Sequence, residues 1–193
     1  LTKAVEIISF RHSMTRLDPK ELEKLYYKLL PNLNSDRDID QIIYEIKNHP
    51  TMSNEKRFKD EFFISSPKRI ASKYILFRLA SKFKEGLMWN SKEIHLEHIM
   101  PQKPKGEWNK IKKNDPELYS DYLDRIGNLT LLRDKLNIEA SNKAFNAKKS
   151  HYIKSGLLIN KEYLLLKYNK WGYKEIEDRQ KNIFKILEDI WTI

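Results

Sequence analysis

The residues best suited to catalysis lie at positions 96–102, where the sequence reads Leu-Glu-His-Ile-Met-Pro-Gln. Glu97 and His98 stand side by side at the end of an apolar stretch that Pro101 closes. Imidazole titrates near neutral pH, which suits His98 to the role of a general base. Glu97 offers a carboxylate oxygen, which hard divalent cations such as Mg²⁺ or Mn²⁺ prefer. Such pairs also decorate the surfaces of strands, so this pair needs support from elsewhere.

Asparagines downstream supply that support. Asn128 follows Gly127 at the start of an apolar run, and Asn137 follows nine residues later. Asn137 offers a second oxygen ligand for a cation, whereas Asn142 is either an alternative ligand or a helix cap. A cation beside a base could hydrolyse a phosphodiester, which needs an activated water and neutralised charge at phosphorus.

Cationic residues follow the asparagines and could contact a substrate phosphate. Lys148 lies six residues after Asn142 on an expected helix, although lysines at such positions are commonly only solvated. Lys143, Lys149 and His151 are further substrate-binding candidates. More lysines, which either contact a DNA backbone or belong to a solvated loop, lie upstream: Lys103, Lys105, Lys110, Lys112 and Lys113.

Short elements must position these residues. The segment 93–101 is partly alternating and ends in proline, which indicates a strand, and 127–132 follows a Gly-Asn turn and indicates another. The polar stretch 103–114 between them is a loop or a short helix, and its Trp108 either packs against other residues or stacks on bases. A helix is predicted over 141–155.

Neighbouring residues on an ideal strand point to opposite faces of the sheet. Glu97 and His98 can therefore converge on one phosphate only if the strand twists or bulges near its end. Pro101 is compatible with such a break, because proline cannot donate a hydrogen bond to the ladder.

Helical patterns occupy the rest of the chain. Apolar residues recur at helical spacing through residues 1–90, with predicted helix starts at Asp18-Pro19, Ser53 and Ser66-Pro67. A last helix carries the apolar stripe Ile176, Ile183, Leu187, Ile190 and Trp191. We therefore predict an α+β chain that is mostly helical.

The composition favours an anionic partner. The formal net charge of the 193 residues is +10, which fits nucleic acid, an acidic protein or membrane face, or simply a lysine-rich surface. The absence of cysteine excludes disulfides and thiolate zinc sites. No signal peptide and no apolar run of membrane-spanning length is visible. Because the chain begins with Leu1, we interpret it as a fragment of a longer protein.

The order of these motifs resembles the HNH (His-Me finger) nuclease superfamily, in which an acidic-His-apolar-apolar-Pro strand precedes a second strand and a helix with an asparagine ligand. The step from Asn128 to Asn137 is similar to that in the HNH domain of RNA-guided CRISPR nucleases. Closer still is the C-terminal nuclease domain of GmrSD-type, modification-dependent restriction enzymes. The residues that carry this resemblance are Glu97–Gln102, Gly127–Leu132, Asn137, Ser141-Asn142, Phe145 and Lys148, and, in the tail, Ile176, Arg179 and Trp191.

The resemblance implies a ββα-metal core at residues 91–160, a helical region at 1–90 before it and a C-terminal helical segment at 161–193. It implies a metal-dependent DNA endonuclease or nickase of bacterial restriction or anti-phage defence, located in the cytoplasm. An N-terminal nucleotide-hydrolysing sensor domain would precede this region in the longer protein. We expect no nucleotide hydrolysis from the chain itself, which lacks a phosphate-cradling glycine loop.

The resemblance also implies roles for individual residues. His98, Asn128 and Asn137 form the catalytic group, with Asn128 holding the loop and the base. The ligands of Mg²⁺ or Mn²⁺ come from Glu97, Asn137 and Asn142, and we favour Asn137 over Asn142 because its spacing fits the superfamily better. The alternative for Asn128 is a plain turn residue.

Three other interpretations stay open at this point. The chain could be a catalytically inactive DNA-binding module of the same fold, although the presence of Glu97, His98 and Asn137 argues against this. The helical front could serve assembly, with an incidental basic surface. RNA could replace DNA as the substrate. His95 invites interpretation as another ligand, but the resembled pattern places none there.

Overall fold

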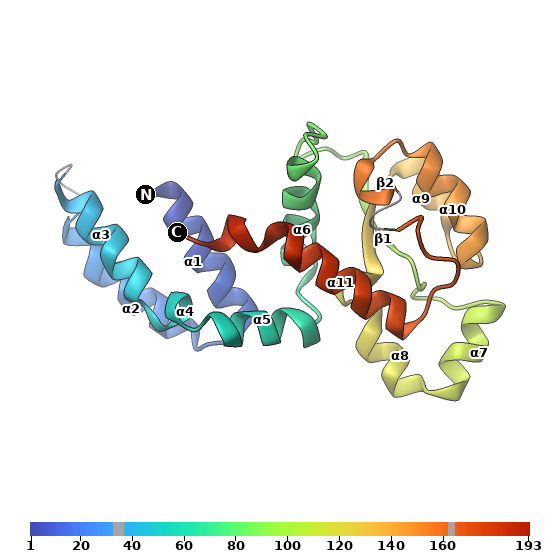
Figure 1. Cartoon of the computed structure of the whole chain (residues 1–193), viewed down its shortest axis with the longest axis horizontal. Coiled ribbons are helices and arrows are strands. Elements are labelled where there is room, and N and C mark those ends of the chain that lie inside the picture. The colour runs from blue at the N-terminus through green and yellow to red at the C-terminus, as the bar shows by residue number, and fades with distance from the viewer. Residues whose placement is uncertain (33–36, 162–164) are drawn as a thin grey trace. The chain divides into compact units, whose positions relative to one another are not determined.

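The structure is a computed structural model and describes residues 1–32, 37–161 and 165–193. Its elements, labelled in Figure 1, divide between two compact units. The helical unit comprises residues 1–65 and 188–193, and the strand unit comprises residues 66–187. The three-part division predicted at residues 90 and 160 stays a prediction, and residues 162–164 of its last part lie outside the described residues.

Local capping, as well as apolar spacing, sets the helices of the helical unit. These are α1 (Thr2–Thr15), α2 (Pro19–Leu29), η1 (Leu30–Asn32), α3 (Arg37–Asn48), α4 (Pro50–Ser53), α5 (Glu55–Ile64) and η4 (Glu188–Trp191). Asp18 caps α2 and Pro19 occupies its first turn, so that predicted start is confirmed. The predicted start at Ser53 is one residue early, because the Asn54 side chain caps α5.

The segment 188–193 completes the core of the helical unit. Trp191 is fully buried, stacks on Phe10 with ring centroids 4.8 Å apart and meets Phe58 edge-on at 5.6 Å. Its carbonyl accepts a hydrogen bond from the buried Arg11 guanidinium at 3.3 Å, and Arg11 also donates to carbonyls in α4. The last residues of the sequence are therefore held by the first helix.

The strand unit surrounds a two-stranded antiparallel sheet with helices. Its elements are α6 (Arg69–Lys82), β1 (Ile94–His98), α7 (Glu107–Asn114), α8 (Pro116–Leu123), η2 (Ile126–Asn128), β2 (Leu129–Arg133), α9 (Asp134–Ala140), α10 (Phe145–Lys154), η3 (Leu158–Asn160) and α11 (Tyr173–Leu187). The strands pair one-to-one, from Ile94 opposite Arg133 to His98 opposite Leu129. The architecture agrees with the predicted α+β, mostly helical class. The predicted start of α6 at Ser66-Pro67 falls slightly early, since Lys68 is its N-cap.

The chain between the two strands is more helical than predicted. Besides α7, which the sequence allowed, α8 begins at Pro116 because Asp115 caps it and accepts a hydrogen bond from the Leu118 amide at 2.9 Å. Trp108 is buried and donates from Nε1 to the Lys143 carbonyl at 2.9 Å. The suggestion that Trp108 stacks on bases is therefore wrong for this conformation, since the ring packs in the core.

The helix predicted over 141–155 is also different. The structure has α9 directly after β2, with Asn137 on it, and a separate α10 that starts only at Phe145. Ser141 separates them because its φ of 42° lies outside the right-handed helical region. Figure 1 shows α9 and α10 beside the two strands.

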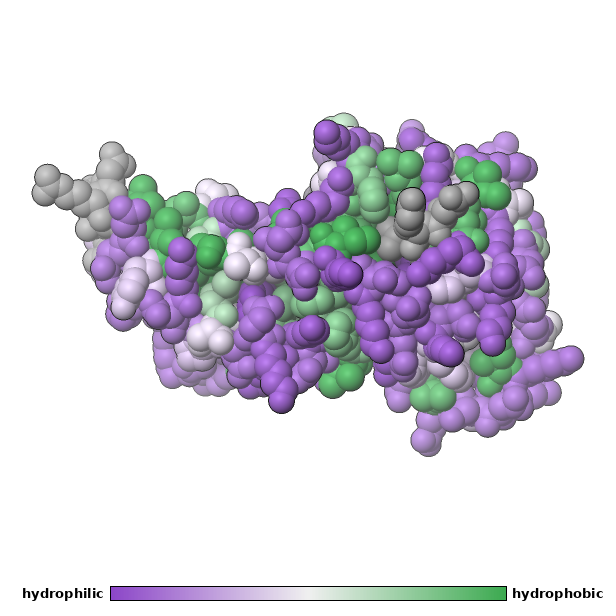
Figure 2. Space-filling view, in the orientation of Figure 1, coloured by the Kyte–Doolittle hydropathy of each residue, from purple (hydrophilic) through white to green (hydrophobic). Residues whose placement is uncertain are grey.

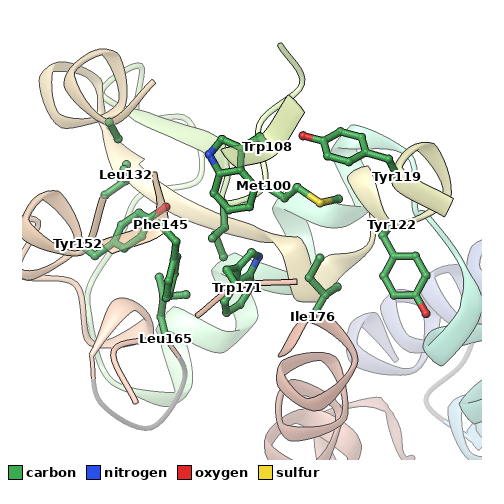
Figure 3. Close-up of a cluster of buried hydrophobic side chains, with 12 residues drawn as sticks. Met100, Trp108, Tyr119, Tyr122, Leu132, Phe145, Tyr152, Leu165, Trp171 and Ile176 are labelled. Carbon is green, nitrogen blue, oxygen red and sulfur yellow. The ribbon is translucent and has the colours of Figure 1, made fainter. Parts of the chain in front are cut away.

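Aromatic residues dominate the core of the strand unit, as Figure 3 shows. Phe145 stacks on Trp171 with ring centroids 5.0 Å apart. Met100, Leu132 and Ile176 belong to the same buried cluster, which joins the end of β1, β2 and the start of α11. This core packs against the strand pair and, through Ile99 and Met100, fixes the backbone that follows β1.

Hydrophilic residues predominate on the face drawn in Figure 2, with hydrophobic residues in separate patches. This distribution agrees with a charged share of 33% and a mostly polar surface. Among the described residues, no helix combines the length and the hydropathy that a membrane crossing requires.

Gly127 lies where η2 passes against α11, and the contact leaves no room for a side chain. A Cβ at this position would come within 2.0 Å of the Ile176 carbonyl oxygen, and backbone atoms on both sides cannot yield easily. We expect Gly127→Ala to lower the free energy of unfolding by about 3 kcal/mol, at the upper end of overpacking effects. Urea unfolding measures this loss. Gly172→Ala is the matched control, since its Cβ would meet only the flexible Glu175 side chain at 3.4 Å. Equal stability of the two variants would contradict the prediction.

Candidate active site

Glu97 and His98 point to opposite sides of β1, as strand alternation requires. Glu97 is bonded by side chains of α10, whereas His98 Nε2 lies 2.8 Å from Asp124 Oδ1 at the end of α8. Of the two predicted distortions, a twist or a bulge, the bulge is absent from β1, because the register through Glu97 and His98 is one-to-one. Both residues nevertheless border one pocket at the end of the strand, so convergence does not require a broken ladder.

This active-site pocket has a volume of about 380 Å³ and brings together most of the predicted catalytic and metal-binding residues. Its polar lining residues are Glu97, His98, Gln102, Lys103, Asn137 and Asn142, with Ser141 between α9 and α10. Asn128, Lys143, Lys148, Lys149 and His151 do not line it. The pocket therefore combines a carboxylate, an imidazole, an ammonium group and three amides.

Asn137 is the asparagine of this pocket whose buried side-chain oxygen, Oδ1, lacks a hydrogen-bond partner among the described residues. Leaving a buried acceptor unpaired is costly, so such an atom is expected to have a partner when the site is functional. A cation would satisfy it. Asn142 borders the same pocket, but its oxygen is not among the buried side-chain atoms that lack a partner in the described part of the chain.

Glu97 forms a buried ion pair with Lys148. Lys148 Nζ lies 2.6 Å from Glu97 Oε1 and 2.7 Å from the His98 carbonyl, and its side chain is 0% exposed. Burial raises the pKa of Glu97, and the Lys148 ammonium opposes this shift. Tyr152 OH adds a longer contact of 3.4 Å to the same oxygen. In this structure the Lys148 ammonium is buried and donates to Glu97 and to the His98 carbonyl, so contact of Lys148 with substrate stays a prediction.

Asp124 orients His98, and sequence reasoning missed it. Burial lowers the pKa of His98, and the hydrogen bond to Asp124 opposes this shift. A neutral imidazole that donates from Nε2 to Asp124 keeps its lone pair on Nδ1, ready to accept a proton. No motif marks Asp124, because it lies 26 residues from His98 at the end of a helix that the pattern did not indicate.

Asn128 supports the site from behind. It is fully buried, and its Oδ1 accepts hydrogen bonds from the Met100 amide at 2.8 Å and from Trp171 Nε1 at 3.1 Å. Its Nδ2 donates to the carbonyls of Met100 and Leu123 at 3.0 and 2.8 Å. Asn128 therefore ties the backbone after His98 to the end of α8, next to Asp124. This fits the expected holding role and excludes a plain turn residue.

The remaining candidates lie away from the pocket in this structure. Lys143 Nζ is 3.2 Å from His151 Nε2, and His151 is buried with Glu139 3.4 Å away. Lys149 Nζ lies 5.2 Å from the Phe145 ring centroid. Contact of these residues with substrate stays a prediction.

The oxygen atoms of Glu97 and Asn137 suit a hard cation, although the part of the pocket that the structure describes contains no cluster of charged ligands. Among the described residues, no group of three or more His, Cys, Asp or Glu side chains could hold a metal ion. A carboxylate and an amide oxygen beside an open pocket suit a cation such as Mg²⁺, which keeps several waters and takes few protein ligands.

Glu97 and His98 thus lie at a strand end, and Asn137 lies on the helix after the next strand, in the order that the sequence motifs predict. The family model described as GmrSD restriction endonucleases, C-terminal domain, matches residues 50–186. The chain belongs to this family, whose domain is an HNH-type nuclease domain, so the predicted membership is confirmed. Neither the curated proteins nor the solved structures include a significant match to the chain.

Proposed function

We propose that this domain hydrolyses phosphodiester bonds in DNA, with His98 as general base and with Glu97 and Asn137 as ligands of Mg²⁺ or Mn²⁺. The observation that carries the proposal is the active-site pocket itself. It combines the Glu97 carboxylate, an imidazole that Asp124 orients and the buried Oδ1 of Asn137, which has no hydrogen-bond partner among the described residues. Family membership supports DNA as the substrate.

His98 acts on the attacking water in this proposal. Its Nδ1 takes the proton, while Asp124 holds the ring and offsets the positive charge that develops on it. Glu97 is held by the Lys148 ammonium, so its position does not depend on a bound metal ion. A bound divalent ion would supply charge neutralisation at phosphorus and at the leaving oxygen.

Asn137 is the preferred second ligand over Asn142. Both border the pocket, but only the Asn137 oxygen is buried without a partner among the described residues. The finer setting is part of the proposal: a bacterial, cytoplasmic anti-phage or restriction protein in which an N-terminal nucleotide-hydrolysing sensor domain precedes this region.

Cleavage of supercoiled plasmid by the chain tests the proposed function. We expect nicking with Mg²⁺ or Mn²⁺ and none with EDTA, because the charge at phosphorus then lacks its neutralising ion. Binding of Mn²⁺, followed by electron paramagnetic resonance, should weaken at least about tenfold in Asn137→Ala. Asn142→Ala should weaken it less, and Asn146→Ala, on the exposed side of α10, should leave it unchanged.

Two results would overturn the proposal. Cleavage that persists in EDTA would mean a different site or a contaminant. DNA binding without cleavage, at any metal concentration, would make the chain an inactive DNA-binding module of the same fold.

A further inference from the structure

His98 borders a second concavity on the face of β1 away from Glu97. This flanking pocket has a volume of about 400 Å³, and Asp124 and Gln102 line it together with the residues that begin α6. Because His98 and Gln102 also line the active-site pocket, the two hollows meet at the proposed base. A DNA strand that presents one phosphate to His98 would therefore have a neighbouring phosphate beside the flanking pocket.

The charge of the flanking pocket comes from α6. Lys68 and Arg69 are exposed and line it, and neither has a carboxylate within ion-pairing distance among the described residues. The one carboxylate on its wall, Asp124, is already bonded to His98 at 2.8 Å. The positive charge of Arg69 is close enough to lower the pKa of His98. The positive charges of Lys68 and Arg69 exceed the negative charge of Asp124, so the lining of the flanking pocket has a net positive charge.

We propose that the flanking pocket binds a backbone phosphate of the DNA strand being cut, with Lys68 and Arg69 as its cationic anchors. This inference rests on the proposed function, since it places the phosphate next to the one attacked at His98. The Ser66 hydroxyl lies on the same wall but donates to the Asp121 carbonyl at 3.2 Å, so Lys68 and Arg69 are the donors for the phosphate. Contacts of this kind position a strand and carry no sequence information.

The test measures DNA affinity of the full chain in EDTA over a salt series, with a fluorescent duplex. The double variant Lys68→Ala/Arg69→Ala should lower the slope of log K against log salt by about 1.8, or about 0.9 for each lost phosphate contact. Lys174→Ala/Lys181→Ala removes the same charge from exposed positions of α11 and should change the slope much less. The charge-keeping variant Lys68→Arg/Arg69→Lys should retain the slope of the wild type.

Equal slopes for the α6 variant and the α11 control would overturn the inference. So would unchanged KM for plasmid cleavage in the α6 variant. These outcomes differ from failure of the proposed function, in which the wild type binds DNA with a normal salt slope but does not cut with metal.

Discussion

Replacing His98 by alanine is expected to slow plasmid nicking by about 10²–10⁴-fold while leaving DNA binding intact. His98 borders the active-site pocket and its Nε2 is bonded to Asp124, so in the proposal Nδ1 is the nitrogen that accepts the proton. Loss of the base removes proton transfer and leaves the Glu97 and Asn137 oxygens in place. Single-turnover cleavage with saturating metal measures the effect, and anisotropy in EDTA measures binding.

The variant Asp124→Asn tests how much the orientation of His98 contributes to cleavage. An asparagine can still accept from Nε2, but it no longer offsets the charge that develops on the imidazole, so we expect a smaller loss that falls on kcat rather than on KM. Asp121→Asn, on the same helix and outside both pockets, should be neutral. Wild-type cleavage by His98→Ala would mean that the general base lies elsewhere.

Lys148→Met is expected to destabilise the strand unit by about 3–5 kcal/mol, because it leaves the Glu97 carboxylate buried without its cation. The Lys148 and Glu97 side chains are 0% and 8% exposed, so water cannot take over the lost interaction. Urea unfolding measures the loss. Lys149→Met, one residue along and partly exposed, should change stability by no more than about 0.5 kcal/mol.

A second substitution separates the ion pair from packing. Glu97→Gln combined with Lys148→Met removes both charges, and it should recover much of the stability lost by Lys148→Met alone. The double variant should nevertheless cleave DNA more slowly than the wild type, because a neutral amide replaces the carboxylate proposed to bind the metal. If the double variant is as unstable as the single one, the methylene stem of Lys148, rather than its charge, carries the effect.

Features set by neighbouring residues could be predicted from the sequence. Asp18 and Pro19 start a helix through local hydrogen bonding and a fixed φ, and both predicted strands exist. Glu97, His98, Asn137 and Asn142 do border one pocket, because motif order places the end of β1 near α9. Their chemical roles stay proposals.

Features set by distant packing could not be predicted. Asp124 reaches His98 only because α8 folds back beside β1, and nothing in its own surroundings marks it. Lys148 looks like any solvated lysine until α10 packs against β1 and buries its ammonium. The break at Ser141 depends on one backbone angle that a serine ordinarily avoids.

The placement of Trp191 has a consequence for synthesis on the ribosome. The chain leaves the helical unit after residue 65, completes the strand unit by residue 187 and then returns to finish the core around Phe10 and Phe58. Because domains fold as they emerge, the unit whose translation begins first is the one completed last. While residues 66–187 are being translated, Arg11, Phe10 and Phe58 lack their contacts with Trp191. The surface that Trp191 later covers is then accessible to a chaperone.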